Sequence, residues 1–306
     1  MPHDHSHGHS GHHHHIDPAA GDRKVALAVA VNLALTVAQV AGGIVSGSVA
    51  LIADAMHNLS DAVALIIAFA ARQIARRPAT PQMSFGYGRA EVVAALVNYT
   101  TLIVISVWLG YEALVRLIDP PEVTGWIVVA LAGFALIIDL ITAGLTWRMA
   151  KDSMNIRAAF LHNLADAGTS VAVIIGGTLI MLYDWRLADP VITLGISGWI
   201  LWHALSEIGP VIRILMLAAP PEMAVAEIQG ALEDQAGVEG VHHLHLWQMD
   251  EKRTSLEAHL VLAEGVESMA VVAAAKARVA EMFGITHVTF EIETRASGCA
   301  GSACTH

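Results

Sequence analysis

The sequence predicts an all-α membrane domain of six spanning helices, followed by a small cytoplasmic α+β domain. The 306-residue chain is 55% hydrophobic and only 15% charged, whereas soluble domains of this length carry more charge. Six apolar stretches approach the ~20 residues that a helix needs to cross a bilayer. They cover residues 25–45, 49–71, 92–115, 124–147, 159–182 and 187–208.

Basic residues predict the orientation of these helices. Ten of them flank one side of the predicted membrane domain, and only Arg116 and Arg186 flank the other. Because cytoplasmic connections carry the excess of lysine and arginine, both termini are expected in the cytoplasm. The ten residues are Arg23, Lys24, Arg72, Arg76, Arg77, Arg89, Arg148, Lys151, Arg157 and Arg213.

A change of pattern after Pro220-Pro221 predicts a second domain in the order α-β-β-α-β. The expected helices cover 222–235 and 267–283, and the expected strands cover 241–249, 255–262 and 287–293. We expect one sheet with two helices on one face. The predicted division is a His-rich tail (1–22), the membrane domain (23–219), the cytoplasmic domain (220–296) and a Cys/His tail (297–306).

Charge and cysteine content narrow the functional classes. The formal charge of −11 argues against a nucleic-acid partner. Most of it is local, because residues 222–295 hold thirteen acidic and five basic side chains. Cys299 and Cys304 both lie in the last eight residues, so they cannot form a disulfide framework for the body of the protein.

The most informative motif is an internal repeat in the second and fifth apolar stretches. Residues 57–62 have the sequence HNLSDA, and residues 162–167 have the sequence HNLADA. On a helix, residues i and i+4 lie about 40° apart around the axis, so each His and its Asp share a face. Helices two and five are separated by an odd number of crossings and therefore run antiparallel, which lets the two pairs converge.

The converging groups are His57, Asp61, His162 and Asp166, which together suit a tetrahedral metal ion. An ionisable residue in a membrane helix costs at least ~2.5 kcal/mol on insertion scales, and structure alone seldom motivates four of them. Two imidazoles and two carboxylates favour Zn²⁺, with Co²⁺ and Cd²⁺ also plausible. The alternative is that the residues only form interhelical hydrogen bonds, which would leave the repetition unexplained.

Further polar residues lie in the same apolar stretches. Asp54 shares a helix face with His57 and Asp61. The alternatives for it are a carboxylate that orients an imidazole or caps the helix, a residue of the access path, or neither of these roles. Asp139 and Asn32 add polar groups to other helices, where they are expected to line the access path. Asn58 and Asn163, which follow the two histidines of the repeat, are expected to line the same path or to support the ligands.

Metal binding at this site is expected to be linked to protons. Zn²⁺ requires neutral imidazole and ionised carboxylate, so loading releases protons and reprotonation expels the ion. The sequence therefore predicts metal/proton exchange, with the site exposed alternately to each side of the membrane.

At several motifs the chain resembles the cation diffusion facilitator family, in particular its bacterial zinc/cobalt/cadmium efflux branch with a His-rich N-terminus. The resemblance covers essentially the whole chain. The matching segments are SVALIADAMH at 48–57, FGYGRAE at 85–91, the second His-x-x-x-Asp pair at 162–166, VHHLHLW at 241–247 and HVTFEIE at 287–293.

The resemblance implies a homodimer that exports metal from the cytoplasm by proton-coupled antiport across the inner membrane. It also implies a metallochaperone-like C-terminal domain. Some family members hold a second metal site in the loop after helix two, but the matching positions here are Thr80, Met83 and Tyr87, so we expect no site there. Two His-x-x-x-Asp pairs resemble the zinc-preferring members and favour zinc over cadmium.

Family metal sites in the C-terminal domain carry over to His242, His259 and Glu293, where Zn²⁺ is expected to have a regulatory role. His245 and His287 are nearby candidates. For His243 and His245, the alternative is that they only decorate alternating faces of a strand.

Both termini carry further metal-ligating side chains. Eight of the seventeen histidines lie in the first fifteen residues, at His3, His5, His7, His9 and His12 to His15. This tail is not expected to fold and favours metal capture. Cys299 and Cys304, with His306, could add soft ligands, although their spacing exceeds that of a Cys-x₂-Cys knuckle.

Two other classes compete with transport. A membrane metalloenzyme needs an open coordination position and an additional acid or base, whereas the four ligands look complete and no nucleophile motif is nearby; we expect no enzyme. A membrane metal sensor would use the histidines of the tail and of the C-terminal domain, but it would leave the membrane ligands without a role.

Overall fold

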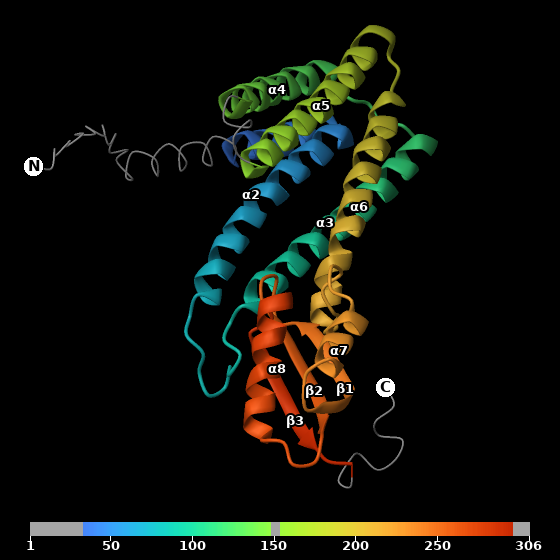
Figure 1. Ribbon diagram of the computed structural model, residues 1–306. Coiled ribbons are helices and arrows are strands. Elements are labelled where there is room, and N and C mark those ends of the chain that lie inside the picture. Colours follow the sequence, from blue (N-terminus) through green and yellow to red (C-terminus); the bar gives the residue numbers. More distant parts are fainter. Residues whose placement is uncertain (1–32, 148–153, 296–306) are drawn as a thin grey trace, which may run out of the picture. The chain divides into compact units, whose positions relative to one another are not determined.

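The computed structural model describes residues 33–147 and 154–295, apart from the side chains at 65, 145–146, 154–159 and 162 (Figure 1). Several sequence-based predictions lie outside these residues. They concern the His-rich tail with its eight histidines, Asn32, and the C-terminal tail with Cys299, Cys304 and His306.

Among the described residues, five helices are long and apolar enough to cross a membrane. Each covers one of the predicted apolar stretches, which confirms a helical membrane domain. A shorter apolar helix, Leu33–Ser46, lies in the first stretch, whose beginning is outside the described residues. The five are α2 (Val49–Ala75), α3 (Arg89–Ile118), α4 (Gly125–Trp147), α5 (Met154–Tyr183) and α6 (Ala188–Leu215).

The chain forms two compact units. The first combines the chain up to Ala62 with Arg116–Ile192, and the second combines Val63–Val115 with Thr193–His306. The first unit therefore contains the helix Leu33–Ser46, the beginning of α2, and the helices α4 and α5. The second contains the remainder of α2, most of α3 and α6, and the C-terminal domain.

In the first unit, α4 and α5 lie side by side (Figure 1). Glycine permits this close approach at Gly125 and Gly177. A Cβ atom added at Gly125 would lie 2.6 Å from the carbonyl oxygen of Gly177, and one at Gly177 would lie 2.9 Å from Val129 Cγ2. Small residues allow such backbone contact between membrane helices.

The N-terminus of α2 is capped by a carboxylate from another helix. Ser48 donates its hydroxyl to Asp189 Oδ1, while the backbone N–H of Val49 donates to Asp189 Oδ2 at 2.9 Å. Ala50 N–H donates to Asp189 Oδ1 at 3.3 Å. The first N–H groups of a helix have no intrahelical acceptor, and a negative charge is favourable at this end of the helix dipole. Asp189, at the beginning of α6, therefore fixes the position where α2 begins.

In the second unit, α3 and α6 pack against each other. Val92 of α3 and Val211 and Ile214 of α6 form a buried cluster, with Tyr99 and Leu215 partly buried beside it. The cluster therefore joins the N-terminal end of α3 to the C-terminal end of α6.

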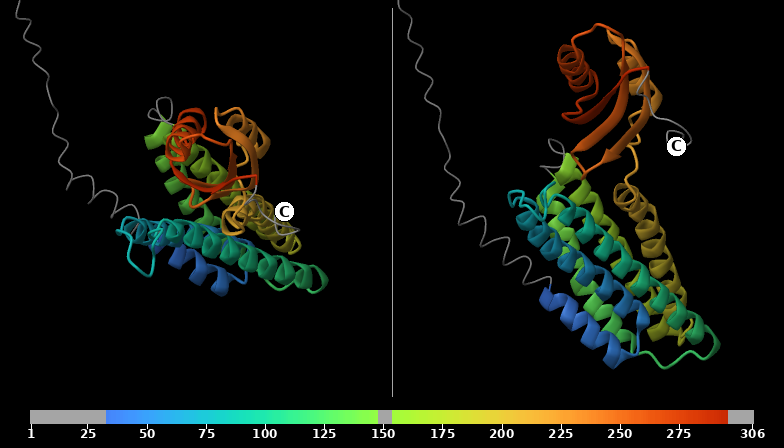
Figure 2. Two further views of the ribbon diagram at one scale, coloured as in Figure 1. Left: turned by 60° about the horizontal axis from the view of Figure 1, so that its bottom comes forward. Right: turned by 90° about the horizontal axis from the view of Figure 1, so that it is seen from below.

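The C-terminal domain has the predicted order α-β-β-α-β. Its elements are α7 (Val225–Glu233), β1 (Val238–Gln248), β2 (Thr254–Leu262), α8 (Ser268–Phe283) and β3 (His287–Glu293). The sheet order is β1-β2-β3, with β1 and β2 antiparallel and β2 and β3 parallel. Both helices pack on one face of the sheet, and Figures 1 and 2 show α8 against it.

The core of this domain explains why its two helices share one face. Ile228 and Leu232 of α7 and Val271, Ala275 and Val279 of α8 are buried in the same cluster as alternate residues of β2. Those residues of β2 are Leu256, Ala258, Leu260 and Leu262. The other set of β2 side chains, which includes Glu257 and His259, must point to the helix-free face because strand side chains alternate.

Local signals set the ends of α8. The Glu267 side chain accepts hydrogen bonds from the backbone N–H groups of Met269 and Ala270, which caps the beginning of the helix. Gly284 ends it with φ of 70°, in the left-handed region that glycine adopts without strain.

The capping of α2 by Asp189 generates a stability prediction. Replacing Asp189 with Asn removes the negative charge and leaves one acceptor oxygen for three donors. We expect this variant to lower the free energy of unfolding by about 1–2 kcal/mol, measured by thermal unfolding in detergent. The matched control is Asp119→Asn at an exposed position, and equal melting temperatures for the two variants would contradict the cap.

Candidate metal sites

Within the membrane helices, the repeat motif brings three ionisable side chains together. His57 Nε2 of α2 lies 3.8 Å from Asp61 Oδ2, one turn further along the same helix. The same nitrogen lies 3.2 Å from Asp166 Oδ1 of α5. One donor atom from each of the three residues lies within 4.8 Å of the others, so α2 and α5 meet at the two halves of the repeat.

The spacing of these atoms suits a small cation. Ligand atoms of tetrahedral Zn²⁺ lie about 2.0–2.2 Å from the metal, and hence about 3.3 Å from one another. The separation of 3.2 Å between His57 and Asp166 is close to that value. The His57 side chain is 14% exposed and that of Asp166 9% exposed, so both are largely withdrawn from solvent.

His162 lies on α5, four residues before Asp166. Its side chain is outside the described part of the structure, so its participation as the fourth ligand stays a prediction. The helical spacing places its Cα on the same face of α5 as that of Asp166.

Asp54 is buried and links three helices of the first unit. Gln39 Nε2 of the helix Leu33–Ser46 donates to Asp54 Oδ2 at 2.7 Å, and Thr169 Oγ1 of α5 donates to Asp54 Oδ1 at 2.8 Å. A carboxylate in a membrane helix needs such donors. Sequence analysis missed Gln39 and Thr169, although a glutamine in the first apolar stretch was a visible signal.

The other predicted pathway residues lie in the same unit. Asp139 Oδ2 of α4 accepts a hydrogen bond from Ser170 Oγ of α5 at 3.3 Å. Asn58 is buried in α2 and Asn163 is half-buried in α5. Ser170 was not singled out from the sequence, because serine is common in membrane helices.

In the C-terminal domain, the helix-free face of the sheet carries most of the metal-ligating residues. We call this surface the open face; it consists of His242, His243, His245, Glu257, His259, Glu291 and Glu293. Facing pairs in the sheet are His242 with His259, His245 with Glu257, and His259 with Glu291. The register therefore gathers residues from all three strands.

Three of these residues form a compact group around Glu293. Its Oε1 lies 2.6 Å from His259 Nδ1, and its Oε2 lies 3.2 Å from His242 Nε2. The Glu293 side chain is only 6% exposed. Two imidazoles and one buried carboxylate are a donor set that fits Zn²⁺, and they are the residues predicted from the sequence.

The two nearby candidates, His245 and His287, lie outside the group around Glu293. His245 does not belong to the group around Glu293; its Nε2 lies 3.2 Å from His243 Nε2 instead. His287, at the beginning of β3, packs edge-on against Phe85, with ring centroids 5.7 Å apart.

The segment between α2 and α3 contains Thr80 and Tyr87, two of the positions at which some family members hold a second metal ion. The hydroxyls of these two residues lie 3.4 Å apart.

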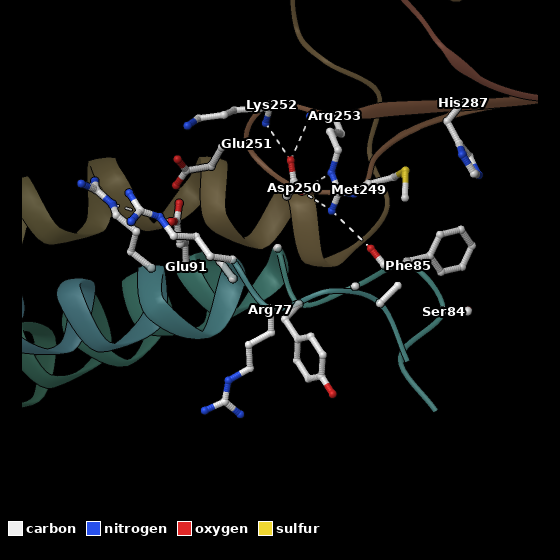
Figure 3. Close-up of a pocket in the computed structure, with 17 residues that line it drawn as sticks. Arg77, Ser84, Phe85, Glu91, Met249, Asp250, Glu251, Lys252, Arg253 and His287 are labelled. Atoms are coloured by element: carbon white, nitrogen blue, oxygen red, sulfur yellow. Dashed lines mark hydrogen bonds and ion pairs between the residues drawn. The ribbon is translucent and has the colours of Figure 1, made fainter. Parts of the chain in front are cut away.

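A polar contact joins this same segment to the turn between β1 and β2 within the second unit (Figure 3). Arg253 Nη2 lies 2.6 Å from Asp250 Oδ2 and also donates to the Phe85 carbonyl at 3.3 Å. Arg89 Nε donates to the Met249 carbonyl at 2.9 Å. Burial raises the pKa of Asp250, but hydrogen bonds from Lys252 and Arg253 outweigh that effect and hold its pKa below the ordinary value.

Comparisons with known proteins match the chain to two family models. The cation efflux transmembrane domain matches residues 25–216, and the cytoplasmic domain of cation efflux proteins matches residues 220–295.

Three named relatives are similar over most of the chain. The metal cation efflux system protein CzcD of Cupriavidus metallidurans is 36% identical over 284 residues, covering 92% of this chain and 89% of that protein. The zinc transporter ZitB of Escherichia coli is 32% identical over 306 residues, covering 99% and 96%. The cadmium, cobalt and zinc/H(+)-K(+) antiporter of Bacillus velezensis is 31% identical over 290 residues, covering 93% and 92%.

These helices and matches define a multi-pass membrane protein of the transporter class. The chain belongs to the cation efflux family, the cation diffusion facilitators, which confirms the resemblance inferred from its motifs. Its second domain is the family's cytoplasmic dimerisation domain. Members of this family are transporters and not enzymes, so the metalloenzyme alternative is set aside.

The contact at Asp250 generates a prediction about local opening. Asp250→Asn removes the charge that orients Arg253, so amide hydrogen exchange in the segment around Phe85 should become faster by about tenfold, which corresponds to the ~1.4 kcal/mol of a charge-assisted hydrogen bond. Glu251→Gln, in the same turn, is the control and should leave exchange unchanged. Because the folded pKa is depressed, the contact is complete above the ordinary pKa of about 3.9. It is lost only as the pH falls further, through the lowered pKa, so protection should not change between pH 7 and pH 5.

Proposed function

We propose that this protein exports divalent metal cations, with Zn²⁺ preferred, by exchange for protons. The observation that carries the proposal is the convergence of His57, Asp61 and Asp166 within 4.8 Å of one another on membrane-spanning helices. His162 is proposed as the fourth ligand of this transport site. Metal cation efflux and zinc transport in CzcD and ZitB support the same activity here.

The donor set supports Zn²⁺ as the preferred cargo. Nitrogen and oxygen ligands in a tetrahedral arrangement suit Zn²⁺, while the imidazoles disfavour Mg²⁺ and Ca²⁺, and the lack of thiolate disfavours Cu⁺. Co²⁺ and Cd²⁺ accept the same ligands and remain secondary cargo.

Proton exchange follows from the chemistry of the ligands. Zn²⁺ and protons compete for the imidazole of His57 and for the carboxylates of Asp61 and Asp166. His57 Nε2 lies 3.2 Å from Asp166 Oδ1, so a protonated imidazole can form an ion pair with this carboxylate. The site can therefore be occupied either by the metal ion or by protons, and alternating access requires both of these forms.

Other polar residues of the first unit are proposed to have roles different from metal binding. Asp54, held by Gln39 and Thr169, is proposed to fix the first turns of α2 beside α5, so that His57 keeps its distance from Asp166. Asp139, Asn58 and Asn163 are proposed to line the access path.

The proposal also covers the C-terminal domain, the oligomeric state and the orientation in the membrane. The open face is proposed to hold a resident Zn²⁺ at His242, His259 and Glu293, where the ion would link β1, β2 and β3 and regulate transport. The protein is proposed to act as a homodimer in the inner membrane with both termini in the cytoplasm. Metal sensing by the C-terminal domain would then regulate transport and would not be a separate function of the protein.

The transport site can be tested by metal flux. Zn²⁺ uptake into proteoliposomes with an imposed pH gradient should fall at least about tenfold for Asp61→Ala and for Asp166→Ala, because each removes a ligand and leaves the others with unbalanced charge. Asp119→Ala, outside the membrane helices, is the matched control. Wild-type flux in both ligand variants would overturn the site.

The coupling can be tested separately by collapsing the pH gradient with a protonophore. With equal Zn²⁺ concentrations on both sides, Zn²⁺ accumulation by the wild-type protein should then fall to that of the Asp61→Ala/Asp166→Ala double variant, because no proton gradient remains to drive it. Internal pH should rise during Zn²⁺ entry when the gradient is present, because protons leave in exchange. Zn²⁺ flux that is independent of the gradient would show that the metal moves without protons.

A further inference from the structure

A second group of metal-ligating residues lies on the open face beside the first. One donor atom from each of His243, His245 and Glu257 lies within 4.8 Å of the others. We propose that these three residues form a separate binding site for a divalent transition-metal cation of the Zn²⁺ class, with water completing the coordination. The metal transport proposed above guides only the choice of ion.

A β-bulge in β1 creates this group. From the pair His242 with His259 to the pair His245 with Glu257, β1 advances three residues while β2 advances two. The extra residue places His242 and His245 on the same face, although a regular strand would point them in opposite directions. Val241 and Leu246 both remain buried in the core, so the bulge gathers histidines on the open face without loss of apolar packing.

His243 adopts an unfavourable backbone conformation within this bulge. Its φ is 50°, in the left-handed region where bulges normally place glycine. Its Nδ1 atom is also buried and has no hydrogen-bond partner among the described residues. Both features cost free energy, and such costs persist chiefly where the side chain has a function.

The geometry of the two imidazoles fits ligation. His243 Nε2 and His245 Nε2 lie 3.2 Å apart, and their rings are nearly perpendicular at 87°. Two nitrogen ligands of a tetrahedral metal ion at about 2.0–2.1 Å are separated by about 3.3 Å. Glu257 faces His245 directly across the sheet and supplies the carboxylate that balances part of the charge of the cation.

The second group shares no residue with the group around Glu293. The two groups are nevertheless adjacent, because the His243 ring packs against His259 with centroids 4.7 Å apart. The open face therefore offers two neighbouring sites, each with two imidazoles and one carboxylate.

Counting bound zinc in the full-length protein tests this inference. The purified protein in detergent is stripped with a chelator, equilibrated with buffered free Zn²⁺ and analysed by mass spectrometry for zinc per chain. His243→Gly, His245→Gln and Glu257→Gln should each bind about one Zn²⁺ fewer per chain than the wild type. Zinc in the N-terminal tail is common to all variants and cancels in the difference.

Matched variants make the result decisive. His243→Gly preserves the left-handed backbone and removes only the imidazole, so thermal unfolding should show a folded protein. Glu264→Gln, an exposed carboxylate after β2, should leave the count unchanged. In the His242→Gln/Glu293→Gln background, His245→Gln should remove a further Zn²⁺.

Two outcomes would overturn the proposal. An unchanged count in His245→Gln would mean that the two histidines share only a hydrogen bond. A loss of two ions from that single change would mean that both ions belong to one two-metal site. The same decrease should occur in the Asp61→Ala/Asp166→Ala protein, which transports nothing if the proposed function is right, so the two proposals can fail independently.

Discussion

The approach of His57 to Asp166 is the contact on which the arrangement of α2 and α5 in the first unit depends. Ionisable side chains in a bilayer are costly unless they meet partners of opposite charge or a metal ion. Because the partner of α2 lies on α5, this cost favours only arrangements in which the two helices meet at the repeat. The Asp54 contacts with Gln39 and Thr169 add a second polar connection close by. Apolar packing alone would leave the rotation of each helix in lipid poorly specified.

Two further features fix the helices that carry His57 and Asp166: the close packing of α4 against α5 and the capping of α2 by Asp189. Gly125 and Gly177 let α4 approach α5, and Asp189 fixes the first residues of α2. His57 and Asp61 lie about two to three turns from that cap, so a shift at the N-terminus of the helix would move both side chains together. The proposed transport site would need such positional control, because ligand distances to Zn²⁺ tolerate only small deviations.

The C-terminal domain uses a different principle to gather ligands. A soluble sheet alternates its side chains between two faces, and here one face is buried by α7 and α8. The bulge at His243 breaks the alternation at one point, which brings an additional histidine to the open face while Val241 and Leu246 stay in the core. Sequence analysis named His245 as a nearby candidate ligand and kept decoration of alternating strand faces as the alternative for His243 and His245. It could not place the two histidines together, because it assumed a regular period of two and a non-glycine bulge has no clear sequence signal.

The sequence alone determined the class of fold, the order of elements in both domains and the family, because these depend on apolar periodicity and on motifs local to the chain. It also identified the His-x-x-x-Asp pairs, since i and i+4 spacing on a helix is a local property. Tertiary structure alone decided that His57 lies nearer to Asp166 than to its own helical partner Asp61. It also decided that Gln39 and Thr169 donate to Asp54 and that Asp189 caps α2. It also placed Glu257 beside His245. Such contacts join residues distant in the chain, and they follow from helix rotation and strand register, which only packing of the whole fold can fix.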